Sequence, residues 1–548
     1  MPTWQRGPNV TLVAFLVCCT FVALSLFLGF VPAKPTRLAT MRSWASLLMP
    51  LGAAVAAQDV DLGWYPPSNT SVNNLTAVLD SQGVYGFIFN TSDTPKSQYG
   101  TYNWCNMPHV RKSEYVKPAA EYELRYVEVI QRHHKRTPYA SNAFPVESYH
   151  WDCDDQGLFY YGSPFGGDKK QPSHGFWKGY ISPVNPFTPS GWIGTCQFPQ
   201  ITSAGLDDSW VHGRDLYGVY HDLLRFLPGK GEDWRSKVMY RVTQNVITSQ
   251  VAGMLINGMW GTSDSVPLMI EAAGVDSLEP QYTCGVGSSL FSAIKSSSNA
   301  AWQNHLNAAA GLYTTLDNIS GVSPSDSGFH ASFDHYFDNL SARQCHAKPL
   351  PCKLVDGVNS TTCVDQALAN SVYRMGQWEY SQMYRDAPTS LAASVTSYGV
   401  WIAELSQHLR DAVANKGGPI YFHNVAHDGS LSRVLSILQV DVMVWPGMGS
   451  EIVFEVYERA GKPSPSSTST PTPNQSTGGH MRTTRAKGAD TGEFFIRVLF
   501  GGKTLRSSNP TLGLLDMVPA ETLLAYFDGL VGAGASLVAG KCNGTTPV

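Results

Sequence analysis

The chain has 548 residues and a formal net charge of −4, with 43% hydrophobic residues but only 15% charged residues. This length suits two to four average domains or one large domain with insertions, and the apolar content is ample for a core. The near-neutral charge balance excludes the general basic surface of a nucleic-acid-binding protein, so no nucleic-acid partner is expected.

Residues 1–57 are predicted to be a targeting region. Residues 11–31 form an uncharged apolar run that is about long enough to span a bilayer. A shorter apolar run, residues 44–57, follows Met41 and ends in small residues, as a signal peptide does before its cleavage site. Basic residues follow the first run, which by the positive-inside rule would leave the body of the protein cytoplasmic.

Sequons and cysteines in the rest of the chain argue against a cytoplasmic body. The Asn-x-Ser/Thr sequons predict glycosylated surface loops; they lie at Asn69, Asn74, Asn90, Asn318, Asn339, Asn359, Asn474 and Asn543. Eight cysteines follow the apolar runs and fit four disulfides of open connectivity. The favoured hypothesis is a secreted glycoprotein that starts at Met41 and has a signal peptide at residues 41–57. The alternative is a single-pass membrane protein, anchored by residues 11–31, with a luminal or extracellular body.

The first motif follows a predicted strand. Residues 58–120 lack long periodicity and are expected to form an irregular N-terminal arm. Residues 124–130 are predicted to be a mostly buried strand. The sequence then runs Arg132-His133-His134-Lys135-Arg136-Thr137-Pro138. Pro138 excludes a helix through this stretch, so these residues lie where a strand ends and a loop begins.

The residue types of this motif indicate an anion site that contains a nucleophile. Arginine suits bidentate contact with phosphate oxygens. A histidine between two such arginines can attack phosphorus and carry the phosphoryl group covalently. The alternative is a solvated basic loop without chemistry.

Arg241 is the next candidate anion ligand. An apolar strand over residues 238–240 precedes it, and a helical pattern follows from Ile247. An arginine at a strand-to-helix turn can reach an anion together with the helix amides. An ordinary surface arginine is the alternative. Residues 262–410 show recurrent helical spacing and are predicted to be a helical insertion domain.

A second motif, His427-Asp428, also follows an apolar strand, residues 419–426, and begins a leucine-rich helix. The positive end of that helix favours an anion. His427 can donate a hydrogen bond to a phosphoryl oxygen, and Asp428 can protonate a departing alkoxide. Asp428 could instead only cap the helix. His423 and His427 have a spacing that can indicate zinc, but the segment is predicted to be a strand and lacks the HExxH glutamate, so no metal site is expected.

Two further strands are predicted at residues 451–457 and 494–500. Between them, residues 461–492 are rich in Ser, Thr and Pro and are predicted to be a disordered loop. The two motifs stand at the ends of separate strands, far apart in the chain. That is the layout of a doubly wound α/β core with a large helical insertion.

The motifs resemble those of the histidine acid phosphatases, the branch that includes acid phosphatases and phytases. Arg132, His133, Arg136 and Pro138 match the Arg-His-Gly-x-Arg-x-Pro signature, and His134 stands where the family usually has glycine. Arg241-Val242-Thr243 matches the start of the segment that carries the family's third phosphate-binding arginine, but the segment is about two residues short. His427-Asp428, followed by Trp445-Pro446, matches the second family motif closely.

The resemblance implies a three-layer α/β/α sandwich with a mostly parallel central sheet and a smaller, mainly helical inserted domain. Residues 121–261 and 411–548 would form the core. The implied activity is secreted phosphomonoester hydrolysis without a cofactor, with a small phosphomonoester as substrate. A membrane would be involved only if residues 11–31 are retained as an anchor.

The resemblance also assigns roles to individual residues. His133 would be the nucleophile that becomes phosphohistidine, and Asp428 the general acid. The phosphate-binding residues would be Arg132, Arg136, Arg241 and His427. His134 and Lys135 are candidate pocket residues. The alternatives are a phytase, although Lys135 is the only pocket lysine evident, and a catalytically impaired phosphate-binding protein on the same fold.

Overall fold

The computed structural model describes residues 60–84, 104–146, 149–154, 158–160, 175–180, 182–188, 194–459 and 493–548. The predicted targeting region at 1–57, the loop at 461–492 and the sequons at Asn90 and Asn474 lie outside these residues. None of the helices described is long and apolar enough to cross a membrane.

A central sheet carries the strands that end in the two motifs. Its strand order is β10-β9-β8-β1-β7-β4, and β11 pairs with β9. The strands are β1 (Tyr122–Arg132), β4 (Val238–Val242), β7 (Tyr421–Ala426), β8 (Glu451–Arg459), β9 (Glu493–Phe500), β10 (Lys503–Thr504) and β11 (Val518–Pro519). β1, β7 and β4 are mutually parallel, whereas β8 to β11 add an antiparallel edge.

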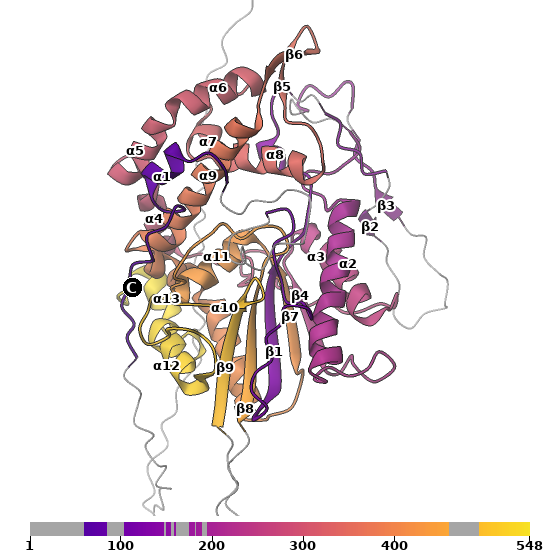
Figure 1. Ribbon diagram of the computed structural model, residues 1–548, viewed down its shortest axis with the longest axis vertical. Coiled ribbons are helices and arrows are strands. Elements are labelled where there is room, and N and C mark those ends of the chain that lie inside the picture. Colours follow the sequence, from indigo (N-terminus) through magenta and orange to yellow (C-terminus); the bar gives the residue numbers. More distant parts are fainter. Residues whose placement is uncertain are drawn as a thin grey trace, which may run out of the picture. The chain divides into compact units, whose positions relative to one another are not determined.

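Helices cover both faces of this sheet (Figure 1). Ile130, Phe422 and Phe454 pack on one face with α10 (Ser390–Val413), α11 (Asp428–Ile437) and α12 (Ala520–Val531). Their neighbours Val129, Tyr421 and Val453 pack on the other face with α2 (Ser203–Tyr217) and α3 (Val246–Trp260). Successive strand residues point to opposite faces, so strands that are buried on both sides are apolar throughout. The predicted three-layer α/β class is confirmed.

A second hydrophobic core lies among the helices that precede α10. It contains large aromatic side chains such as Trp302, Phe337 and Trp378, and it also includes Trp104 and Trp445. Its helices are α4 (Gly285–Ile294), α5 (Ala300–Ala308), α6 (Ala310–Ser320), α7 (Ser327–His330), α8 (Asp334–Cys345) and α9 (Gln366–Ser381). The hairpin of β5 (Cys352–Val355) and β6 (Val358–Cys363) lies beside α6. The domain boundaries given above stay a prediction.

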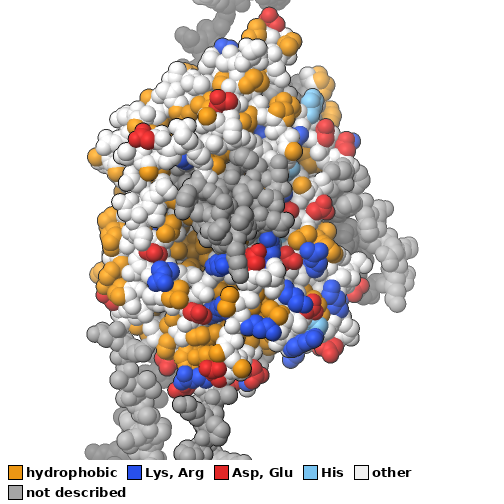
Figure 2. All heavy atoms as spheres, in the orientation of Figure 1, with side chains coloured by type: hydrophobic (Ala, Val, Ile, Leu, Met, Phe, Trp, Pro, Cys, Tyr) orange, Lys and Arg blue, Asp and Glu red, His pale blue; other side chains and the backbone are white. Residues whose placement is uncertain are grey.

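The remaining elements are short. They are α1 (Leu75–Asp80), α13 (Val538–Asn543), the hairpin of β2 (Leu158–Tyr160) and β3 (Gly175–Trp177), the 3-10 turns Ala140–Asn142 and Ala533–Ala535, and the π-helical turns Gly218–Leu223 and Gln382–Asp386. On the face drawn in Figure 2, acidic and basic side chains are interspersed among the described residues, in keeping with the small net charge.

The prediction of four disulfides is confirmed. The pairs are Cys105–Cys345, Cys153–Cys196, Cys284–Cys542 and Cys352–Cys363. Cys105–Cys345 joins the arm before β1 to the end of α8. Cys284–Cys542 joins the start of α4 to the helix α13 near the end of the chain.

One predicted glycosylation site is wrong. Asn339 lies in α8 with no exposed surface, and its side-chain amide donates a hydrogen bond of 2.9 Å to the carbonyl of Asn142. A glycan on that nitrogen is incompatible with the fold. The other described sequon asparagines are exposed; they are Asn69, Asn74, Asn318, Asn359 and Asn543.

Removing Cys284–Cys542 should destabilise the protein more than removing Cys352–Cys363. The first pair closes a loop with a sequence separation of 258, the second one of 11. Loop-closure entropy then predicts losses in unfolding free energy of about 5 and about 3 kcal/mol. Denaturant unfolding of the two double-serine variants checks this, and a loss for Cys352–Cys363 equal to or above that for Cys284–Cys542 would contradict it.

Candidate active site

Three parallel strands end at one edge of the sheet and bring both motifs together. Arg132 pairs with Ala426 in the β1–β7 register, and Val242 pairs with Val425 in the β4–β7 register. The backbone N–H of His133 donates a hydrogen bond of 3.1 Å to the carbonyl of Ala426. The residues that follow each strand therefore meet, as expected at the carboxyl ends of parallel strands.

These residues line a cavity of about 330 Å³. The lining contains three arginines, two histidines and four carboxylates, together with aromatic and small residues. The lining residues are Arg132, His133, Arg136, Tyr139, Asn142, Glu279, Pro280, Asp334, Asp338, Tyr380, His427, Asp428, Gly429, Ser430, Arg433 and Trp445.

His133 is held as a neutral imidazole. Its Nδ1 lies 3.0 Å from the carbonyl oxygen of His134. A carbonyl oxygen only accepts, so Nδ1 carries the proton and Nε2 keeps its lone pair. Burial, and then the charges of Arg136 and Arg132, lower the pKa of His133 well below its ordinary value. The lone pair on Nε2 of His133 is therefore available to act as a nucleophile.

Arg132 and Arg136 bring two buried positive charges to the cavity. Arg132 is 1% exposed, donates 2.6 Å to the carbonyl of Pro446 and lies over the Trp104 ring. Arg136 contacts Asp338 at 3.0 Å and lies over the Tyr139 ring. The Nε–H groups of both arginines are buried and have no acceptor among the residues that the structure describes. Two guanidinium groups in the lining of one cavity suit an anionic ligand.

Asp428 lies beside this arginine pair. Its Oδ2 is 3.0 Å from Nη2 of Arg132 and accepts a hydrogen bond of 2.7 Å from the indole of Trp445. Burial raises the pKa of Asp428, but the attraction of Arg132 and the Trp445 hydrogen bond outweigh it, so the pKa is lowered overall. The residue at the N-cap of α11 is His427. Asp428 therefore faces the cavity and does more than cap the helix.

His427 faces His133 across the cavity. Their ring centroids are 5.4 Å apart. Nε2 of His427 lies 3.1 Å from Oγ1 of Thr243 and 3.5 Å from Oε1 of Glu279. Burial lowers the pKa of His427 to about 4, although Asp428 opposes the shift. A neutral His427 can donate one hydrogen bond to a phosphoryl oxygen.

The prediction that His134 and Lys135 are pocket residues is wrong. His134 is fully buried and, like Lys135, is not among the residues that line the cavity. Its Nε2 lies 3.1 Å from Nδ1 of His212, and a Cβ on Gly449 would come within 2.3 Å of its ring. The ring therefore fits because residue 449 is glycine. Lys135 pairs with Asp208 on α2 at 3.0 Å.

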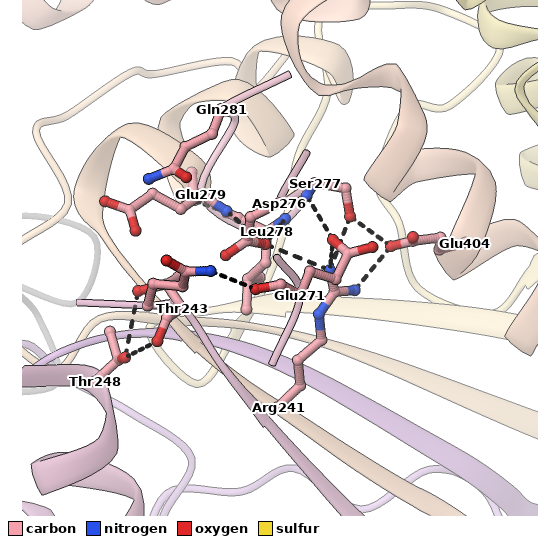
Figure 3. Close-up of polar contacts among 12 residues, drawn as sticks. Arg241, Thr243, Thr248, Glu271, Asp276, Ser277, Leu278, Glu279, Gln281 and Glu404 are labelled. Carbon is pink, nitrogen blue, oxygen red and sulfur yellow. Dashed lines mark hydrogen bonds and ion pairs between the residues drawn. The ribbon is translucent and has the colours of Figure 1, made fainter. Parts of the chain in front are cut away.

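The predicted phosphate role of Arg241 is also wrong. Its guanidinium contacts Glu271 at 2.5 Å and Glu404 at 2.8 Å, and Asp276 lies 3.5 Å away (Figure 3). These carboxylates hold it outside the cavity. Thr243, the first residue after β4, reaches His427 instead.

Several cavity residues were not identified from sequence. Arg433 lies on α11 beyond Asp428, and its Nη1 donates 2.8 Å to the carbonyl of Gly429. Its place on the helix after His427-Asp428 was a usable signal. Glu279 and Tyr380 come from segments far from both motifs, and no sequence pattern identified them as cavity residues.

His423 does not share a site with His427. Its Nε2 lies 2.8 Å from Oε1 of Gln131, and its Nδ1 lies 2.8 Å from the hydroxyl of Tyr421. Both rings are therefore committed to different hydrogen-bond networks.

No family model matches the chain, and no curated protein matches its sequence. Similar solved structures include the phytase of Klebsiella sp ASR1, which is 13% identical over 76% of this chain and 97% of that chain, with a TM-score of 0.44. The phytase from D. castellii is 12% identical over 87% of this chain and 89% of that chain, with a TM-score of 0.42. The multiple inositol polyphosphate phosphatase of Bifidobacterium longum, in a complex with phosphate, is 11% identical over 74% and 93%, with a TM-score of 0.39.

Phytases belong to the branch that the sequence motifs resemble. At this identity and superposition, however, the likeness assigns no activity. The site residues have to carry that assignment.

Replacing His423 by glutamine should make stability less sensitive to acid. Burial lowers the pKa of His423 from 6.5 to about 3. Below pH 6.5 the unfolded chain therefore binds a proton that the folded protein refuses, and stability falls as pH falls. The advantage of the wild type over His423→Gln should shrink by about 2 kcal/mol between neutral pH and pH ~5. Denaturant unfolding at several pH values measures this, and parallel curves for the two proteins would refute it.

Proposed function

We propose that the protein is a secreted, acid phosphatase-like phosphomonoesterase that works through a phosphohistidine intermediate. The observation that carries this proposal is the neutral imidazole of His133 between two buried arginines with unsatisfied Nε–H groups, opposite the carboxyl of Asp428. A nucleophile, an anion clamp and an acid thus share one cavity.

In the first step, the phosphoryl oxygens bind Arg132, Arg136 and His427. Nε2 of His133 attacks phosphorus, and a P–N bond forms as the ester P–O bond breaks. The electron pair goes to the leaving oxygen, which takes a proton from Asp428. A dianionic phosphate beside Asp428 raises its pKa again and helps it to hold that proton.

In the second step, the Asp428 carboxylate takes a proton from water. The water oxygen attacks phosphorus, the P–N bond breaks, and phosphate leaves with His133 restored. The proposed scheme needs no cofactor, because the two guanidinium groups supply the positive charge that phosphoryl transfer requires.

The alternative is an impaired phosphate-binding protein. Its sequence support was His134 and the short segment after Arg241. His134 lies away from the cavity, so it no longer supports impaired activity. Arg241 is absent from the cavity, so the argument from its shortened segment remains. This alternative expects phosphate binding without a phosphoenzyme.

The proposed secretion has separate support. Four disulfides are typical of oxidising compartments, and five described sequon asparagines are exposed.

His133→Ala should abolish hydrolysis of p-nitrophenyl phosphate, with a loss in kcat of at least about a thousandfold. The assay uses protein from a secretory host with chelator present, and an unchanged circular dichroism spectrum controls for folding. Rapid quenching should trap phosphohistidine in the wild type only. Turnover by a folded His133→Ala protein would assign the nucleophile elsewhere, and no turnover by the wild type would favour the binding-protein alternative.

The rate should be highest at acid pH, and Asp428 should set its decline. The pKa of Asp428 is lowered, so the free enzyme loses its general acid as pH rises, whereas His133 stays neutral far into the acid range. Asp428→Asn should remove this decline. It should cost about a hundredfold or more with an alkyl phosphate and much less with p-nitrophenyl phosphate, whose leaving group needs little protonation. Profiles of kcat/KM against pH measure both effects, and equal losses on both substrates would exclude Asp428 as the acid.

A further inference from the structure

The cavity carries no surplus of positive charge. Its lining has three arginines against four carboxylates. Arg132 is paired with Asp428 and Arg136 with Asp338, whereas Arg433 donates hydrogen bonds to Ser397 and to the Gly429 carbonyl. Glu279 and Asp334 also line the cavity, and within the described part of the chain neither forms an ion pair with lysine or arginine. The pocket can therefore compensate one phosphoryl group, but it offers little to a substrate that carries several.

Glu279 is fixed in place by the cluster around Arg241. Asp276 accepts hydrogen bonds from the backbone of the loop that carries Glu279, including one of 2.9 Å from the Leu278 N–H. Ser277 is tied to Glu271 by its backbone N–H at 2.7 Å. Arg241 joins these carboxylates, and the Glu279 side chain points away from them (Figure 3). Arg241 thus helps to hold the loop that carries Glu279 through Asp276 and Ser277.

Glu279 and an aromatic pair, Tyr380 and Trp445, line the same cavity as Asp428. The Glu279 side chain is 27% exposed, and its Oε1 is 3.5 Å from His427. The ring of Tyr380 stacks on Trp445 with centroids 3.9 Å apart. Trp445 also donates to Asp428, the acid that serves the leaving group. A cavity lined by both a carboxylate and aromatic rings offers the groups that recognise alkylammonium ions.

We propose that this pocket selects phosphomonoesters whose leaving alcohol carries an alkylammonium group, and disfavours polyphosphorylated esters such as phytate. Two independent features support the proposal. The guanidinium groups of Arg132 and Arg136, which line the cavity beside His133, would receive the single phosphoryl group, and Glu279 with the Tyr380–Trp445 pair would receive the cation. The proposal rests on the phosphatase function above, because it assigns the substrate class of the same site.

The test compares phosphocholine with its carbon isostere, in which a quaternary carbon replaces the ammonium nitrogen. Size and shape are matched, so the ratio of the two kcat/KM values measures the effect of the charge alone. Near neutral pH the wild type should favour phosphocholine by about five- to tenfold, as expected for one partly screened charge contact. Glu279→Gln should reduce the ratio to about two, and Asp334→Asn should reduce it less.

Glu121→Gln is the matched control. Glu121 is exposed and precedes the start of β1, at the opposite end of the strand from Arg132, so its loss changes the net charge equally but should leave the ratio unchanged. A wild-type ratio near one, an equal ratio in Glu279→Gln, or a higher kcat/KM for phytate than for phosphocholine would overturn the proposal.

Binding measurements distinguish a failure of this substrate proposal from a failure of the proposed phosphatase function. Calorimetry with His133→Ala gives the dissociation constants of phosphocholine and of the isostere without turnover. Hydrolysis of p-nitrophenyl phosphate without a binding preference for phosphocholine would reject the substrate class alone. A binding preference without any turnover by the wild type would reject the phosphatase function and retain the selectivity.

Discussion

The contact between Arg132 and Asp428 is the interaction on which the site depends. It joins the last residue of β1 to the first residue of α11, at 3.0 Å and with Arg132 almost fully buried. A buried guanidinium is tolerated only where its charge is balanced and its donors are satisfied. The Pro446 carbonyl and the Trp104 ring supply part of that balance. The segments before β1 and after α11 are therefore as necessary to the site as the motifs themselves.

Sequence reasoning located the strand ends well. Apolar runs before Arg132 and before His427 are long enough to define buried strands, and parallel pairing places their ends together. Sequence reasoning did not predict which side chains after each strand point into the cavity. Arg241 and Thr243 both point to one side of β4, yet only Thr243 lies close enough to the strand end to reach His427. The carboxylates that hold Arg241 come from segments that no local pattern connects to it.

His134 illustrates the same limit at a single residue. Set against the Arg-His-Gly signature, a histidine at this position suggested a crowded phosphate pocket. In the structure the ring lies outside the cavity lining, hydrogen-bonded to His212, which in turn contacts Glu451 at 2.8 Å. The space comes from Gly449, which has φ of +70° and no side chain to meet the ring. A substitution in a motif can thus be accommodated by a residue that the motif does not include.

In the proposed mechanism, the pH requirements of catalysis and of stability oppose each other. Asp428 is a proton donor only when pH is low, whereas His134, His212 and His423 are buried as neutral rings and resist protonation. Lowering the pH therefore supplies the acid and at the same time weakens the core behind it. A bound phosphate relieves the conflict locally, because its negative charge raises the pKa of Asp428 without acting on the histidines on the far side of β1. Under the proposed mechanism, the substrate itself therefore helps to set the protonation state that its cleavage requires.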